Sequence, residues 1–129
     1  MQEKDCSAPL HPAALHGLEL FNAGEYFEAH EALETAWRAE RGPIRILYQG
    51  ILQVAVAYLH TQRGNYGGAI ALAERARSKL QTWPEVCRGV QVGDLLKDLA
   101  LVTEALTNLG SQGITAFDQR LFKPVKFER

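Results

Sequence analysis

The chain has 129 residues, of which 47% are hydrophobic, and its 14 basic and 15 acidic side chains leave a formal net charge of −1. This length predicts a single domain over residues 1–129, with enough apolar residues for one core. The balanced charge predicts no nucleic-acid partner, and no apolar run reaches the roughly 18–20 residues of a membrane span, so no membrane partner is expected.

The pattern of helix-forming segments and helix-ending residues predicts an all-α fold of about five helices in antiparallel hairpins. Apolar residues recur at helical spacing in five segments, which prolines, asparagines and glycines separate. The predicted helices cover about residues 12–22, 25–40, 43–63, 66–82 and 94–109. Gly24 and Gly64 fall between helices, where we expect tight turns with a positive φ. The stretch "EVCRGVQVG" is predicted to be a loop, and we predict no strand.

The segment 111–129 follows a helical bundle predicted to cover about residues 10–110. It carries several large apolar side chains, among them Phe117, Leu121, Phe122, Val125 and Phe127. Such a segment is too apolar for a free disordered tail, so we expect it to dock. Docking on its own bundle is favoured over docking on a second copy, because an intramolecular segment loses less association entropy. The chain is expected to be a monomer or a homodimer.

An internal similarity relates two of the predicted hairpins at an offset of 40 residues. Gly24, Tyr26, Ala29, Glu34 and Ala36 match Gly64, Tyr66, Ala69, Glu74 and Ala76. The glycine permits a tight turn, the tyrosine wedges between two helices, and the alanines allow a close approach. The pattern is similar to the second helix of a tetratricopeptide repeat, although that repeat has a period of about 34 residues. We therefore predict a tetratricopeptide-like bundle, and the alternative that any two helical hairpins look alike stays open.

The two cysteines give a prediction about the compartment. Cys6 and Cys87 stand far apart in the sequence and form no CxxC pair. We therefore expect neither a disulfide framework nor a thiolate zinc site. A reducing compartment follows, most simply the cytoplasm or, after processing, an organelle stroma.

Polar residues interrupt the apolar pattern of the second and third predicted helices. His30 and Glu34 lie one turn apart at the edge of an apolar stripe, with Trp37 one turn further on. In the next helix the polar positions are Arg45, Gln49, Gln53 and His60. The short "RGP" turn makes these two helices antiparallel neighbours, so residues equally distant from the turn face each other.

These facing positions predict a polar Glu/His/Gln pocket between the two helices. We expect Glu34 to be held by Arg45 and Gln49, and His30 to be held by Gln53. His60 lies about 10 Å beyond Gln53 along the helix axis, at 1.5 Å per residue.

Three stretches together resemble the uncharacterised family called domain of unknown function 309. They are "FNAGEYFEAHEALETAWR", "YQGILQVAVAYLH" and "RGNYGGAIALAERARSKL", within about residues 15–80. The resemblance implies a small multi-helical bundle of bacteria, archaea and plastids, sometimes labelled a predicted metal-dependent hydrolase. Carried over position by position, the motif residues are Glu28, His30, Glu31, Glu34, Trp37, Gln49, Gln53 and His60.

Two functions of different classes stay open at this point, and no residue is assigned as catalytic. The favoured hypothesis is a binding module for an unknown protein or small-molecule ligand, with no cofactor. The alternative is a metal-dependent hydrolase in which His30 and Glu34 are candidate ligands of a divalent metal. A catalytic metal needs a third protein ligand, and Glu31 and Gln53 are poor candidates for it.

Overall fold

The computed structural model describes residues 2–128, and within them the chain forms six α-helices and one short β-hairpin. The elements are α1 (Gln2–Ser7), α2 (Pro12–Asn22), α3 (Tyr26–Ala39), α4 (Ile44–Gln62), α5 (Tyr66–Leu80), β1 (Val86–Cys87), β2 (Val90–Gln91), α6 (Val92–Gly113), η1 (Ile114–Ala116) and η2 (Gln119–Leu121). The predicted all-α class is confirmed, and α2 to α6 are the five predicted helices. None of the helices in residues 2–128 combines the length and hydropathy needed to cross a membrane.

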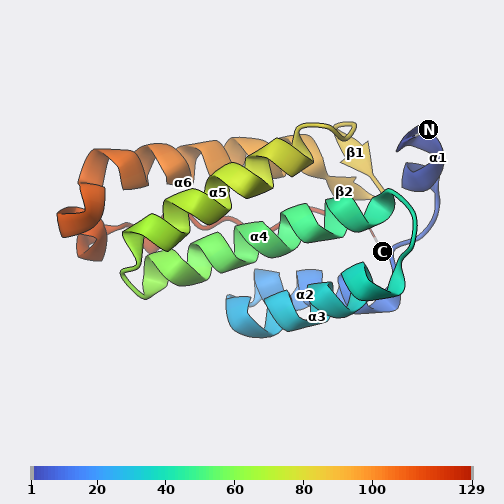
Figure 1. Ribbon diagram of the computed structural model, residues 1–129, viewed down its shortest axis with the longest axis horizontal. Helices are drawn as coiled ribbons and strands as arrows, with labels where there is room; N and C mark the ends of the chain where they lie inside the picture. Colours follow the sequence, from blue (N-terminus) through green and yellow to red (C-terminus); the bar gives the residue numbers. More distant parts are fainter. Residues whose placement is uncertain (1, 129) are drawn as a thin grey trace.

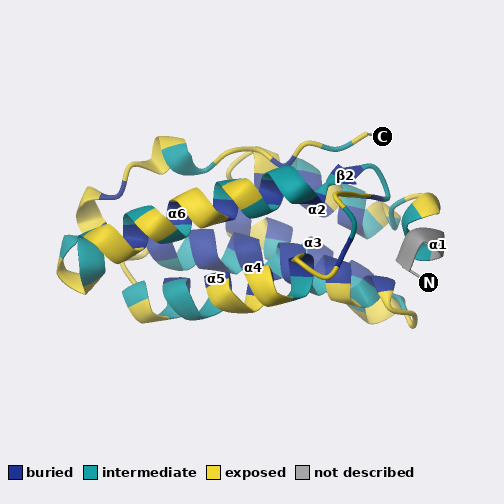
Figure 2. Cartoon of the chain, turned by 90° about the horizontal axis from the view of Figure 1, so that it is seen from above, coloured by how far each residue is buried: buried dark blue, intermediate teal, exposed yellow. Residues whose placement is uncertain are grey.

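The central helix of the bundle is α4. Consecutive helices pack on one another, α2 on α3, α3 on α4, α4 on α5 and α5 on α6 (Figure 1). Most of α4 is buried, whereas α6 exposes one side (Figure 2). Two glycines permit close approach, because a Cβ on Gly17 would lie 2.7 Å from Cγ of Leu33, and one on Gly50 would lie 2.8 Å from Cδ2 of Leu80.

Two glycines also make the turns of the central hairpins. Gly24 has a φ of 80° between α2 and α3, and Gly64 has a φ of 73° between α4 and α5. The backbone N–H of the next residue, Glu25 or Asn65, closes each turn on a carbonyl of the preceding helix. The predicted positive φ is confirmed at both positions, and it explains why a residue without a Cβ stands there.

The prediction that no strand is present was wrong for residues 86–91. Val86 pairs with Gln91 and Cys87 pairs with Val90 in an antiparallel hairpin. The two turn residues, Arg88 and Gly89, have φ values of 52° and 80°. Two-residue strands are too short to show the alternation that identifies a strand, and arginine is not a residue that usually marks such a turn.

The expectation that the two cysteines stay apart was also wrong. Cys6 and Cys87 form a disulfide across a sequence separation of 81 residues. The backbone N–H of Arg88 also donates to the carbonyl of Cys6, at 2.8 Å. Sequence spacing gives no information about this proximity, because it arises when the N-terminal segment packs against the hairpin.

The C-terminal segment returns along the bundle to the same hairpin. The α6 backbone leaves helical geometry at Gly110, and the chain then passes behind α4 in the view of Figure 1. Phe117 and Val125 are buried, and Phe127 forms an antiparallel bridge with Val90. Residues 114–128 therefore lie against their own helices, and both Cys6 and residues 126–128 contact the hairpin at one end of the bundle (Figure 1).

Candidate functional site

Three polar residues of α3 form a line of close contacts between their side chains on the helix surface. Nε2 of His30 lies 3.9 Å from Oε2 of Glu34, and Oε1 of Glu34 lies 3.4 Å from Nη2 of Arg38. Each residue is four positions from the next, so the three side chains lie one above another on α3. The side chains of His30, Glu34 and Arg38 are 28%, 36% and 71% exposed, respectively. The line is therefore a surface feature and not a buried network.

Aromatic side chains flank this line. The guanidinium carbon of Arg45, at the start of α4, lies 5.0 Å from the centre of the Trp37 ring on α3, which is a cation–π distance. The exposed ring of Phe27 lies 5.8 Å from the His30 ring. We call this set of residues the α3 patch: Phe27, His30, Glu34, Trp37, Arg38 and Arg45.

The predicted group of Glu34, Arg45 and Gln49 does not form. Among the described residues, Glu34 pairs with His30 and Arg38 of its own helix, and Arg45 packs on Trp37 instead. Partners one turn away on the same helix compete successfully with those across the interface, because the helix already holds them within reach. Arg45 Nε consequently remains buried without a hydrogen-bond partner among residues 2–128.

Gln53 does not pair with His30 either. It is buried, and its Oε1 has no partner within the described part of the chain. Each four-residue step overshoots the 3.6-residue turn by about 40°, so Arg45 and Gln53 point about 80° apart around α4. Arg45 meets α3, whereas Gly50, about 60° from Gln53, meets α5. The polar side chains of α4, from Arg45 to Gln53, therefore follow an oblique path around the helix. They do not line one pocket together with α3.

His60 supports the turn between α4 and α5. Its Nδ1 lies 3.2 Å from Nδ2 of Asn65, and Oδ1 of Asn65 accepts the backbone N–H of Gly68 at 3.0 Å. Because the amide oxygen is the acceptor for Gly68, the amide nitrogen is the donor to His60. The role of His60 is thus to hold the N-cap of α5. Glu28 and Glu31 are exposed on α3.

The α3 patch supplies only part of a metal-ligand set. A catalytic zinc is typically held by three protein ligands, and His30 and Glu34 are two. Among the residues that the structure describes, no three histidine, cysteine, aspartate or glutamate side chains are grouped closely enough to hold one ion. The described donors therefore do not fit a complete catalytic metal centre.

Arg88 organises a polar cluster that sequence reasoning missed. Its Nε donates to the carbonyl of Asp5, and its Nη1 donates to the Tyr48 hydroxyl at 3.0 Å. Nη1 also lies 3.8 Å from the Glu40 carboxylate, and the Arg88 side chain is only 9% exposed. The "RG" pair in a predicted loop was the one available signal for this turn.

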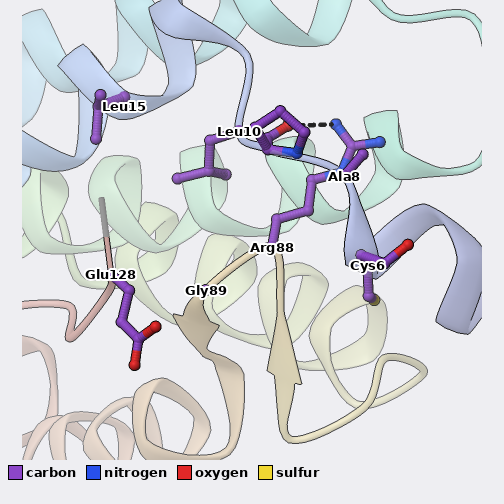
Figure 3. Close-up of a pocket in the computed structure, with 9 residues that line it drawn as sticks. Cys6, Ala8, Leu10, Leu15, Arg88, Gly89 and Glu128 are labelled. Atoms are coloured by element: carbon purple, nitrogen blue, oxygen red, sulfur yellow. Dashed lines mark hydrogen bonds between the residues drawn. The ribbon is translucent and has the colours of Figure 1, made fainter.

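Two cavities lie away from the α3 patch. One, of about 390 Å³, lies beside Arg88, where Leu10 and Leu15 stand across from Gly89 and Glu128 (Figure 3). Figure 3 also shows the hydrogen bond from Arg88 to the carbonyl of Pro9. The other, of about 280 Å³, lies between the end of α2 and the C-terminal segment. No α3-patch residue lines either cavity.

Comparisons with known proteins support the resemblance predicted from the motifs. Residues 14–72 match the family described as "Domain of unknown function (DUF309)". The chain is also 26% identical over 76 residues to an uncharacterized protein of Aquifex aeolicus (strain VF5). That similarity covers 58% of this chain and 23% of the Aquifex protein, so the chain spans less than a quarter of that relative. The family match includes the α3 patch but neither α6 nor the C-terminal segment.

Proposed function

We propose that this chain, whose residues 14–72 match a family without an assigned activity, is a binding module that engages a protein or small-molecule ligand. The polar site that we inferred between α3 and α4 then takes the form of the exposed α3 patch. The observation that carries the proposal is Phe27, which is 44% exposed beside the charged line of α3. Aromatic residues and arginine supply much of the binding energy at protein interfaces.

The side chains of the α3 patch contact one another within the chain. Trp37 and Arg45 pack together across two helices, and Glu34 restrains both His30 and Arg38. Side chains ordered in advance lose less entropy on binding, which favours affinity. Exposed ion pairs contribute only about 0–1 kcal/mol to folding, so stability alone is a weak reason for this arrangement.

Peptides displayed on phage as a random library provide the test. Peptides selected on the full chain should bind the Phe27→Ala variant at least about tenfold more weakly, a loss of about 1.4 kcal/mol. Leu101→Ala is the matched control, because Leu101 is a 53% exposed apolar side chain on α6. Peptides that respond equally to both substitutions, or to neither, would contradict the proposal.

The second candidate function is the metal-dependent hydrolase, which the proximity of His30 and Glu34 favours. It is tested by metal analysis of protein purified without an affinity tag, and of the His30→Ala variant. A stoichiometric metal that disappears in the variant would support the hydrolase. The binding module predicts no stoichiometric metal in either protein.

We further propose that the module works in the cytoplasm, as inferred from the sequence. Cytosolic thiols keep most cysteine pairs reduced, so the Cys6–Cys87 bond would form there only under oxidising conditions. Alkylation of the free thiols in freshly lysed cells, followed by mass spectrometry of the intact chain, tests this placement. Two alkylated cysteines are expected, and a disulfide that is already complete would indicate an oxidising compartment.

A further inference from the structure

The C-terminal segment binds the bundle in the way that an extended peptide ligand binds a receptor. Within residues 118–128, Val125 is the one buried residue, and the others are partly or fully exposed. Lys123, Pro124 and Lys126 all face solvent. The segment therefore lies on a surface that the helices and hairpin form, and its Leu121, Phe122 and Phe127 side chains pack against the core while remaining partly exposed.

The receptor surface recognises the backbone of this segment. The Asn22 side chain makes two hydrogen bonds to Val125: its Nδ2 donates to the carbonyl at 2.9 Å, and its Oδ1 accepts the backbone N–H at 2.7 Å. Further along, the backbone N–H of Gln91 donates to the carbonyl of Lys126 at 2.9 Å. The backbone N–H of Glu128 donates to the carbonyl of Gly89 at 3.0 Å. Addition of a strand to a sheet edge is a common mode of peptide recognition.

An aromatic site next to Asn22 holds one side chain of the segment. The Phe122 ring stacks on Tyr58 with 4.4 Å between ring centres, and it meets Tyr26 edge-on at 5.6 Å. The Tyr58 hydroxyl is buried and has no hydrogen-bond partner within the described residues. The internal segment thus provides no partner for this hydroxyl, which a side chain of another ligand could supply.

The charge of Asp94 and a neighbouring cavity indicate which kind of peptide segment this surface binds. Nζ of Lys126 lies 3.6 Å from Oδ2 of Asp94 on α6, so the surface favours a basic segment. The cavity of about 280 Å³ is lined by Asn22, Tyr26 and Phe122, among others. The aromatic site therefore has unfilled room beside the Phe122 ring.

We propose that this surface, formed by Asn22, Tyr26, Tyr58, Asp94 and the hairpin edge 89–91, recognises an extended segment of a partner protein. Residues 117–128 occupy it as an internal ligand. The expected partner segment carries an aromatic residue three positions before a small β-branched apolar residue, with basic residues around them, as Phe122, Val125 and Lys126 do here. Binding of the partner displaces the internal segment.

Competition between the internal segment and a synthetic peptide tests this inference in the full chain. The probe is a fluorescent peptide of residues 114–128, measured by fluorescence anisotropy. The Phe122→Ala chain should bind it at least about tenfold more tightly than the unmodified chain, because the tethered competitor is weakened. Adding Asn22→Ala to that chain should reduce binding at least about tenfold, since the backbone contacts are lost.

A peptide with alanine in place of Phe122 is the matched control, and it should not bind. If the Phe122→Ala chain fails to fold, Lys126→Glu weakens the internal segment at an exposed position instead. A dimer formed by exchange of these segments would also support the inference, because a second copy would supply the ligand. Absence of binding to both weakened chains, or binding that ignores Asn22→Ala, would overturn it.

Discussion

Glu34 illustrates how exposure limits the value of an ion pair. The sequence predicted Arg45 and Gln49 as partners for this carboxylate, whereas its side chain is 36% exposed and pairs along its own helix. Glu34→Ala should therefore lower the free energy of unfolding by less than about 1 kcal/mol, and not by the roughly 3–5 kcal/mol of a broken buried pair. Urea denaturation measures this, with the exposed Glu31→Ala as control. A loss above about 2 kcal/mol would show that Glu34 has a buried partner in solution.

Asp98 is expected to make stability depend on pH. Burial raises the pKa of its carboxyl group from the usual 3.8, Asp94 raises it further, and Lys126 and Lys123 oppose the shift. A raised pKa in the folded state means that protonation favours folding. The stability from this group is therefore complete below about pH 3.8 and is lost as the pH rises through the folded-state pKa.

Replacement of Asp98 by asparagine should remove that loss. The Asp98→Asn variant is expected to gain stability relative to the unmodified chain as the pH rises from 3 to 7, because its amide does not ionise. Urea denaturation across this pH range measures the difference, with the exposed Glu104→Gln on α6 as control. A gain that is constant with pH would contradict the assignment to Asp98.

The helical hairpins depend on the backbone geometry of their turns. Alanine at Gly24 or Gly64 should lower the free energy of unfolding by about 1 kcal/mol, because both positions have φ values near the left-handed region. Gly67 is the matched control, since it lies within α5 and a Cβ there would meet nothing within 4 Å. Gly67→Ala should be neutral or stabilising by up to about 1 kcal/mol. Thermal melts that rank the three variants equally would refute the turn argument.

The helices could be predicted from sequence because each is a local feature. The site could not, because it depends on how residues far apart in the sequence are oriented in space. Gly24 and Gly64 give strong local signals, and the bounds of α2 to α5 followed from them and from apolar spacing. The predicted pairings of Glu34 with Arg45 and of His30 with Gln53 were wrong, because residues at four-residue spacing drift around a helix, which separates Arg45 from Gln53. The disulfide joins residues 81 positions apart, and no local pattern reports such a contact.

Truncation after Gly110 tests the role of the C-terminal segment in the whole molecule. Removal of residues 111–129 exposes Tyr58 and Tyr26, which Phe122 covers, and it deletes the buried Phe117 and Val125. Each fully buried side chain of this size contributes about 1.5–3 kcal/mol, so the melting temperature should fall clearly. Sedimentation should show an unchanged monomeric mass. A dimer that becomes a monomer on truncation would instead show exchange between copies.

The short hairpin of residues 86–91 has a consequence for the order of folding during synthesis. It binds Cys6 on one side and Phe127 and Glu128 on the other, whereas α2 to α5 pack mainly on their sequence neighbours. Contacts between sequence neighbours form faster than contacts between distant residues. The central helices can therefore pair as they leave the ribosome, but the hairpin gains its bridge to Phe127 and its hydrogen bond from Glu128 only after residue 128 has emerged. A nascent chain that has not yet exposed residues 127 and 128 would keep its paired helices and leave the edge of β2 at Val90 without a partner.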